Sequence, residues 1–191
     1  MLPTREEAEK LLRDAEGCNP GLWGNHSRVA AKCAERIAEN CPGMDSEKAY
    51  ILGLLHDIGR KFGVRHLGHV IDGYHYMNAL GYDEAARICL THSFHRPELS
   101  LYIGKTDTTE EETGELLSAL QAAKQDEYDD LIRLCDALAG TEGVMDIEDR
   151  MADVKRRYGF YPQEKWDENL CLKAEFERKT GKNLYELLEN L

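Results

Sequence analysis

Four polar side chains with the chemistry of metal ligands stand where the helical pattern of the sequence requires core residues: His26, His56, Asp57 and Asp136. Any one of them alone could be a core residue satisfied by hydrogen bonds. A buried carboxylate is costly unless it is paired or binds a metal, so two aspartates beside histidines are hard to explain by packing. All seven histidines also fall between residues 26 and 95, and this clustering favours a site.

The types of the four side chains indicate which ion they would bind. Imidazole and carboxylate groups together suit iron, manganese, cobalt, nickel or zinc better than calcium, which prefers oxygen ligands. The sequence therefore predicts a site for one or two divalent transition-metal ions. Adjacent ligands at positions 56 and 57 would point in different directions at a helix end, so one side chain can bind inward while its neighbour bridges.

Amphipathic helices are expected to position these side chains. A helix over about 26–40 has an apolar stripe with i, i+3/i+4, i+7 spacing that begins at His26. A helix capped by Asp45 or Ser46 carries His56 near its end, and a helix from Asp126 through Ala139 carries Asp136 on its buried side. Three separate helices thus contribute ligands to one place.

The rest of the chain also has helical periodicity, and no run of alternating β-branched residues or Asn-Gly turn predicts a strand. We expect an all-α protein of one domain over 1–191, with a metal-binding core at about 20–140 and a C-terminal helical extension at about 145–191. The other expected helices cover about 4–17, 66–80, 83–92, 116–123, 145–158, 162–179 and 183–191. The acidic tract Thr106–Thr113 is interpreted as a solvated loop and helix start.

Composition excludes several classes of function. A hydrophobic content of 42% and a charged content of 31% are typical of a globular protein, and the net charge of −12 argues against binding a nucleic acid polymer. No apolar run approaches the roughly 20 residues needed to span a membrane, and the N-terminus lacks a signal-peptide pattern. We therefore expect a cytoplasmic protein with no membrane partner. Its six scattered cysteines are expected to be reduced. No feature predicts an oligomeric state.

The order of His26, His56-Asp57-Ile58-Gly59 and Asp136 resembles the HD-domain superfamily of metal-dependent phosphohydrolases. The resemblance covers residues 20–140 and implies an HD-domain helical bundle, here with additional C-terminal helices. It also implies that His26, His56, Asp57 and Asp136 hold one ion.

Two further histidines are similar to the extra ligands of the two-metal branch of that superfamily. His69 has a glycine four residues later, as in that branch, and His92 matches the next histidine. Asp57 would then bridge to a second ion held by His69 and His92. His66 is an alternative to His69 without the glycine spacing, and His75 is expected to face solvent or lie behind the ligands. The six positions occur in the same order in hydrolases of diadenosine tetraphosphate.

This resemblance implies a hydrolase that cleaves a phosphoester or phosphoanhydride of a nucleotide or dinucleoside polyphosphate by a metal-bound hydroxide. Asp57 and Arg60 are the expected catalytic residues, with Arg60 in a place where the family often has lysine. The substrate phosphate is expected to contact Arg60, Lys61, His95 and Arg96. Carboxylates are expected to orient the ligand histidines. The 44-residue gap between the ligands at 92 and 136 is long for the diadenosine-tetraphosphate enzymes, and its segment Leu99–Gln125 is expected to cover or rim the site.

Three alternatives remain open from the sequence. A mononuclear enzyme would use only the first four ligands. A di-iron oxygenase resembling inositol oxygenase would use a similar ligand set for a different reaction. A non-catalytic module would keep the site for structure and dock a partner on its charged C-terminal helices.

Overall fold

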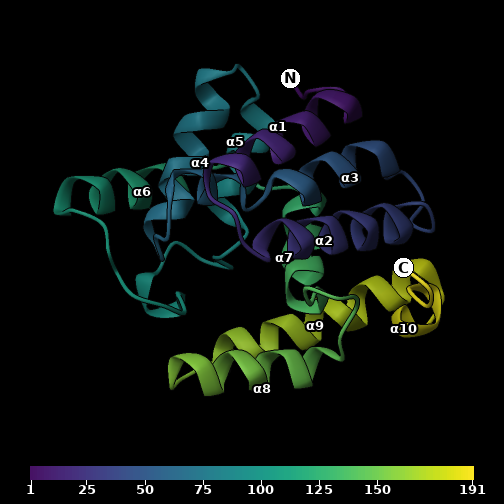
Figure 1. Cartoon of the computed structure of the whole chain (residues 1–191). Helices are drawn as coiled ribbons and strands as arrows, with labels where there is room; N and C mark the ends of the chain where they lie inside the picture. Colours follow the sequence, from purple (N-terminus) through teal and green to yellow (C-terminus); the bar gives the residue numbers. More distant parts are fainter.

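The computed structural model describes all 191 residues and is helical throughout (Figure 1). The only strand-like pairing is a single bridge between Ala139 and Val144, so the all-α prediction is confirmed. In chain order the helices are α1 (Arg5–Cys18), α2 (Trp23–Ala38), α3 (Ser46–Leu55), η1 (Ile58–Phe62), α4 (Gly68–Ala79), α5 (Asp83–Thr91), η2 (Leu99–Leu101), α6 (Glu110–Ala122), α7 (Glu127–Leu138), α8 (Ile147–Tyr158), α9 (Gln163–Thr180) and α10 (Leu184–Leu187). None of them is both long and apolar enough to cross a membrane.

Local signals in the sequence explain most helix starts. Thr4, Thr109 and Asp126 each form a capping box, in which the cap side chain accepts from a backbone N–H and a carboxylate three residues later accepts from the cap backbone. The capping box at Thr109 starts α6 earlier than the short helix expected around 116–123, because the acidic tract itself enters the helix.

Two other helix limits differ from the expected ones. α2 begins at Trp23 rather than near residue 26, so the first candidate ligand lies inside its first turn and not at its start. α10 ends at Leu187 instead of continuing to residue 191.

One continuous cluster of 35 buried hydrophobic residues extends from α1 to the residues that follow α10. α2 and α3 pack at its centre, and α7 crosses behind them (Figure 1). A second cluster of eight buried residues lies between α4, the residues after α5, and α6. The candidate ligands lie on helices that meet between these two cores, so packing on both sides holds their backbones in place.

Two glycines allow the helices around the candidate ligands to approach closely. A methyl group at Gly53 in α3 would lie 2.8 Å from the backbone of Ala31 in α2. A methyl group at Gly59 in η1 would overlap the carbonyl oxygen of His69 and lie 2.5 Å from the backbone nitrogen of Gly73, both in α4. Gly59 therefore sets the distance between the His56-Asp57 pair and α4.

Candidate metal centre and cleft

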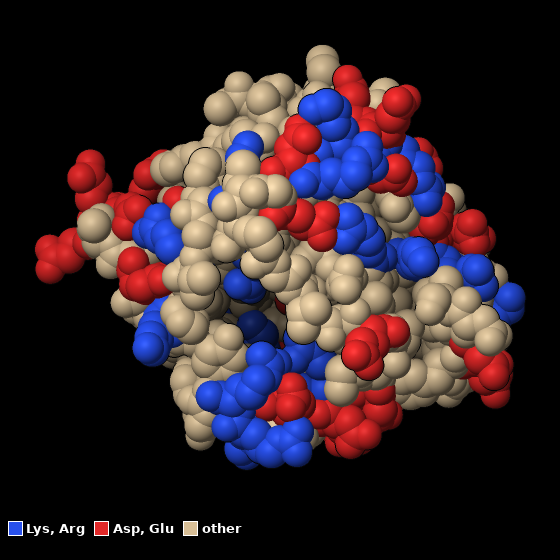
Figure 2. Space-filling model, viewed as in Figure 1, with Lys and Arg blue, Asp and Glu red and all other residues tan.

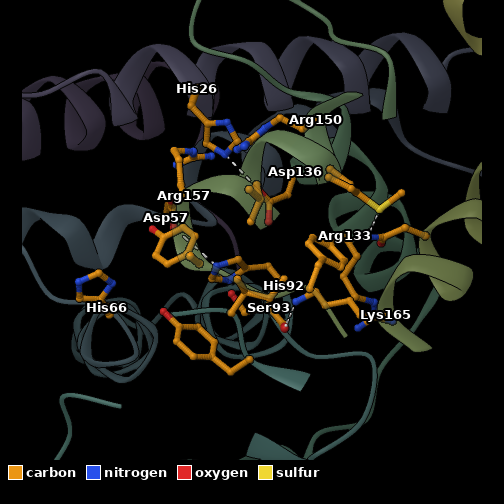
Figure 3. A pocket seen from close by; sticks show the side chains of 18 of the residues that line it. His26, Asp57, His66, His92, Ser93, Arg133, Asp136, Arg150, Arg157 and Lys165 are labelled. Carbon is orange, nitrogen blue, oxygen red and sulfur yellow. Dashed lines mark hydrogen bonds and ion pairs between the residues drawn. The ribbon is translucent and has the colours of Figure 1, made fainter. Parts of the chain in front are cut away.

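The structure brings the six sequence-predicted ligands together, and all of them except His56 line the base of one cleft. Figure 3 labels four of them, His26, Asp57, His92 and Asp136. His56 and Asp57 follow the last turn of α3, and His92 directly follows α5. Five of the six side chains are buried, whereas Asp136 is partly exposed and faces the cleft. The complete set is His26 of α2, His56, Asp57, His69 of α4, His92 and Asp136 of α7.

The donor atoms form two groups that share one residue. His26, His56 and Asp57 form the first group, and Asp57, His69 and His92 form the second, with the donor atoms of each group within 4.8 Å of one another. Asp136 joins the first group, because its Oδ1 lies 2.9 Å from the Nε2 of His26 and 3.9 Å from that of His56. Asp57 is thus the only residue placed to contact ions in both groups.

Backbone carbonyls fix the orientation of all four rings. The Nδ1 of His26 lies 3.1 Å from the carbonyl oxygen of Ala139, that of His56 lies 2.7 Å from Gly53, and that of His92 lies 2.9 Å from Cys89. The Nδ1 of His69 bonds in the same way to the carbonyl oxygen of the residue three positions earlier. Backbone carbonyls, and not the carboxylates expected from the sequence, therefore orient the ligand histidines. Each ring reaches a carbonyl of its own helical turn or of a neighbouring loop.

These hydrogen bonds make the Nε2 atoms acceptors. A neutral imidazole that donates from Nδ1 has only a lone pair on Nε2. Yet Nε2 of His69 lies 3.0 Å from Oδ1 of Asp57 and 3.4 Å from Nε2 of His92. The Nε2 of His56 and the Oδ1 of Asp57 are buried without any hydrogen-bond partner. Converging lone pairs repel one another unless a cation lies between them, so the donor set fits divalent metal ions.

The charges of the ligands also fit metal binding. Burial lowers the pKa of His92 to about 3 and lowers that of His56, which keeps both rings neutral near pH 7. Burial raises the pKa of the Asp57 carboxyl, but Arg60 and the nearby histidines outweigh this and hold that pKa well below its usual range. Neutral rings and ionised carboxylates are the forms that bind metals.

Arg60 lies beside the cluster as expected, whereas Lys61 does not. The Nε of Arg60 donates to Oδ2 of Asp57 over 2.5 Å, and the guanidinium group lines the cleft. Lys61 points away from the cleft and donates to the hydroxyl of Tyr76 over 3.0 Å. The short helix η1 explains the difference, because its consecutive residues point about 120° apart.

The other two residues expected to bind the phosphate also differ in position, since one lines the cleft and the other does not. His95 lines the cleft, with its Nε2 3.2 Å from Oδ1 of Asn169. Arg96 is half exposed, pairs with Glu164 at the start of α9, and does not line the cleft. The structure therefore places Lys61 and Arg96 away from the position predicted for them.

The two remaining histidines lie apart from the ligand groups. His66 lines the cleft but packs its ring against Tyr158, with 6.1 Å between ring centroids. His75 is exposed and interacts with Glu115. Of His66 and His69, the two alternative ligands predicted from the sequence, it is therefore His69 whose Nε2 lies next to Asp57.

The cleft above the cluster has a volume of about 300 Å³. Tyr102 and Ile103 of the segment 99–125 form part of its wall, and α6 lies behind them on the second core. One whole side of this cleft was not predicted from the sequence. That side comprises Arg133 and Ala137 of α7, Arg150, Met151, Val154, Arg157 and Tyr158 of α8, and Tyr161, Lys165 and Asn169 in and before α9.

The residues that α8 contributes to this side of the cleft could have been predicted from the sequence pattern. Arg150 and Arg157 are seven residues apart and flank Met151 and Val154, two apolar positions of the α8 stripe. Residues at i and i+7 share one helix face, so both arginines lie next to the buried stripe. For Lys165 and Asn169 the chain offers no comparable signal.

The fold and the site define a helical protein with a His/Asp cluster able to hold metal ions at the base of a cleft. A comparison with family models gives a match to the HD domain over residues 23–141. The chain therefore belongs to the HD domain family, which suggests a metal-dependent hydrolase. Searches of curated proteins and of solved structures found no significant match.

Proposed function

We propose that this protein is a metal-dependent phosphohydrolase that cleaves a phosphoester or phosphoanhydride bond in a small substrate, in particular a nucleotide or dinucleoside polyphosphate. The convergence of imidazole lone pairs and carboxylate oxygens, with two buried atoms lacking any partner, carries this proposal. Membership of the HD domain family supports the same chemistry. A cleft of about 300 Å³ suits a small molecule rather than a polymer.

The ligands divide between two ions in this proposal. His26, His56, Asp57 and Asp136 would hold one ion, and His69 and His92 would hold a second that shares Asp57. When bound, divalent ions polarise phosphoryl oxygens and lower the pKa of coordinated water. The chain itself contributes rigid rings, because every Nδ1 is tied to a carbonyl, and a carboxylate held in one orientation by Arg60.

Arg60 has a second task in the proposal. Only its Nε is used by Asp57, and its Nη atoms make no hydrogen bond within the protein. A planar guanidinium group on the wall of the cleft can donate to two oxygens of a phosphoryl group as negative charge builds there. Lysine at this position would keep the charge but lose this paired geometry.

The test begins with protein loaded separately with iron, manganese, cobalt, nickel or zinc. Each form is incubated with phosphomonoesters, nucleotides and dinucleoside polyphosphates, and product release is measured. We expect metal-dependent release of phosphate or nucleotide. Asp57→Asn should abolish it, while Asp72→Asn, which breaks a different Asp–Arg pair on α4, should not.

The same samples separate the alternatives. About two ions per chain, falling to one in His92→Ala, would support the dinuclear form, and one ion in the wild type would support the mononuclear form. Oxygen uptake by the iron-loaded protein without release of phosphate would replace the proposal with the oxygenase alternative. Bound metal without turnover of any compound would favour the non-catalytic module.

A further inference from the structure

The cleft extends beyond the segment that matches the HD domain. The family match ends at residue 141, but α8 and α9 continue the wall and bring cationic side chains to it. In Figure 3, Arg150, Arg133 and Lys165 lie on the same side as Asp136, and His66 lies on the opposite side. Figure 2 shows blue side chains within and below a hollow on this face.

Arg150 is anchored next to a candidate ligand without a carboxylate partner. Its Nε donates over 3.1 Å to the carbonyl oxygen of Ala139, the same oxygen that receives the Nδ1 hydrogen of His26. No carboxylate lies within ion-pair distance of Arg150, and its Nη atoms make no hydrogen bond within the protein. The side chain is therefore held beside the cluster with unused donors at the cleft.

Lys165 is anchored in a similar way, by a backbone carbonyl next to another candidate ligand. Its Nζ donates over 2.6 Å to the carbonyl oxygen of Ser93, the residue after His92. No carboxylate oxygen lies within 4.0 Å of that ammonium group. The charged groups that influence it are Asp136, Glu168 and Arg133.

The lack of a carboxylate partner is unusual for an arginine of this chain. It has 36 acidic and 24 basic residues, so carboxylates are in excess. Every arginine except Arg150 and Arg178 lies within 4.0 Å of a carboxylate, and Arg178 is fully on the surface. A cation that is partly desolvated and left unpaired is unfavourable unless an anion arrives.

A third cation at the same wall has an unused buried donor. Arg133 is 6% exposed and lines the cleft. Its Nη atoms bond to carbonyls and to Asp130, but its Nε is buried with no hydrogen-bond partner. The wall formed by α7, α8 and α9 therefore offers several cationic donors, and the candidate ligand Asp136 is the only acidic side chain of these helices that lines the cleft.

We infer that this wall binds a second anionic group of the substrate, separate from the phosphate that is cleaved, through Arg150 and Lys165. The inference rests on the proposed function and narrows it. The substrate class becomes an organic phosphate that carries a further phosphate or a carboxylate. Arg60, which pairs with Asp57, remains the donor to the phosphate that is cleaved.

Calorimetric binding to two matched pairs of compounds tests the inference, first on metal-free protein and then with manganese. AMP and ADP differ by one phosphate, and glycerol 3-phosphate and 3-phosphoglycerate differ by a carboxylate. We expect the wild type to bind the member with two anionic groups, in at least one pair, about tenfold more tightly than the member with one, as expected for a charged hydrogen bond. The pair that shows this preference identifies the second group.

Variants then locate the binding group. Arg150→Gln and Lys165→Gln should each weaken binding of the preferred compound about tenfold and leave the affinity for its counterpart with one anionic group within about twofold of the wild-type value. Arg150→Lys and Lys165→Arg, which keep the charge, should recover most of the loss and exclude misfolding as its cause. Arg178→Gln and Lys155→Gln remove equally unpaired, exposed cations from α9 and α8 and should change nothing.

Two outcomes would overturn the inference. Equal affinity of the wild type for both members of both pairs would do so, as would the same loss in the surface controls. If phosphate release occurs but Arg150→Gln and Lys165→Gln bind every compound normally, the inference fails and the proposed function stands. If nothing is hydrolysed but both variants lose the preference, the anion site stands and the proposed function fails.

Discussion

Replacement of Asp57 by asparagine is the sharpest test of the candidate metal centre, because this carboxylate belongs to both ligand groups. Its Oδ1 lies 3.0 Å from Nε2 of His69 and 3.6 Å from Nε2 of His92. An amide of the same shape has no negative charge and presents one NH₂ group where the carboxylate has an oxygen. Asp57→Asn should therefore lose both ions.

The size of the effect follows from linkage between binding and folding. An ion present at 100 times its Kd stabilises the folded state by about 2.7 kcal/mol. For a chain of this length 1 kcal/mol shifts the Tm by about 2–4 °C. One ion should therefore raise the wild-type Tm by about 5–11 °C, and two ions by about twice that.

Metal-free Asp57→Asn should be somewhat less stable than the metal-free wild type. Arg60 and the nearby histidines hold the pKa of Asp57 well below its usual range, so the folded state favours the charge that the substitution removes. The Arg60 side chain is 35% exposed, so solvent partly screens its pairing with Asp57 and limits the loss. The decisive quantity is therefore the Tm shift of each protein on adding metal, and the variant should show none.

Thermal unfolding with and without manganese, together with the metal content of each sample, provides the measurement. Asp72→Asn is the control, because it removes an Asp–Arg pair of similar burial without touching the ligand groups. It should keep the full shift. If Asp57→Asn retained both the metal content and the Tm shift of the wild type, the proposed centre would be refuted.

Three further results are expected. Gly59→Ala should destabilise the protein by about 1–3 kcal/mol because its methyl group meets the backbone of α4, whereas Gly114→Ala, with nothing within 4 Å, should stabilise it slightly in chemical denaturation. Burial and the adjacent cations lower the pKa of His95 to about 3. As the pH falls, His95 therefore becomes protonated in the unfolded chain at a higher pH than in the folded protein. Metal-free stability should then drop by about 2 kcal/mol between pH 7.5 and pH 5 from this group, and His95→Gln should remove that part of the slope while the exposed-ring control His75→Gln should not. Burial lowers the pKa of Lys165 to about 8, so the affinity for the preferred compound with two anionic groups should fall as the pH rises through 8. A pH-independent affinity in the wild type would contradict this.

Local pattern predicts two of the ligands, because His26 and Asp136 stand in strongly amphipathic helices, whereas His69 and His92 were predicted from the family resemblance. His26 starts an apolar stripe, and Asp136 follows Cys135 on the buried side of a helix with a capping box. Such local patterns fix which side chains point inward. One core lies between α2, α3 and α7, so donor side chains that point inward from these helices meet there.

The phosphate-binding residues could not be predicted as well, because their directions depend on contacts made far along the chain. Arg96 turns away from the cleft to pair with Glu164, which is 68 positions later in the chain. Lys61 turns toward Tyr76 within the following helix. Neither partner is apparent from local spacing, whereas the pairing of Arg60 with Asp57 spans only three residues.

The cleft is formed partly by the segment that matches the HD domain and partly by the C-terminal helices, and this has a consequence for substrate specificity. The ligands all lie within residues 23–141, the part that matches the HD domain, whereas Arg150 and Lys165 lie after it. Two chains with the same ligands but different C-terminal helices would then share metal chemistry and differ in the compound they accept. The Ala139 carbonyl, which contacts both His26 and Arg150, joins the two parts physically. A change in how α8 packs on α7 would therefore move a ligand ring as well as an anion-binding side chain, so the C-terminal helices should affect metal affinity although they contribute no ligand.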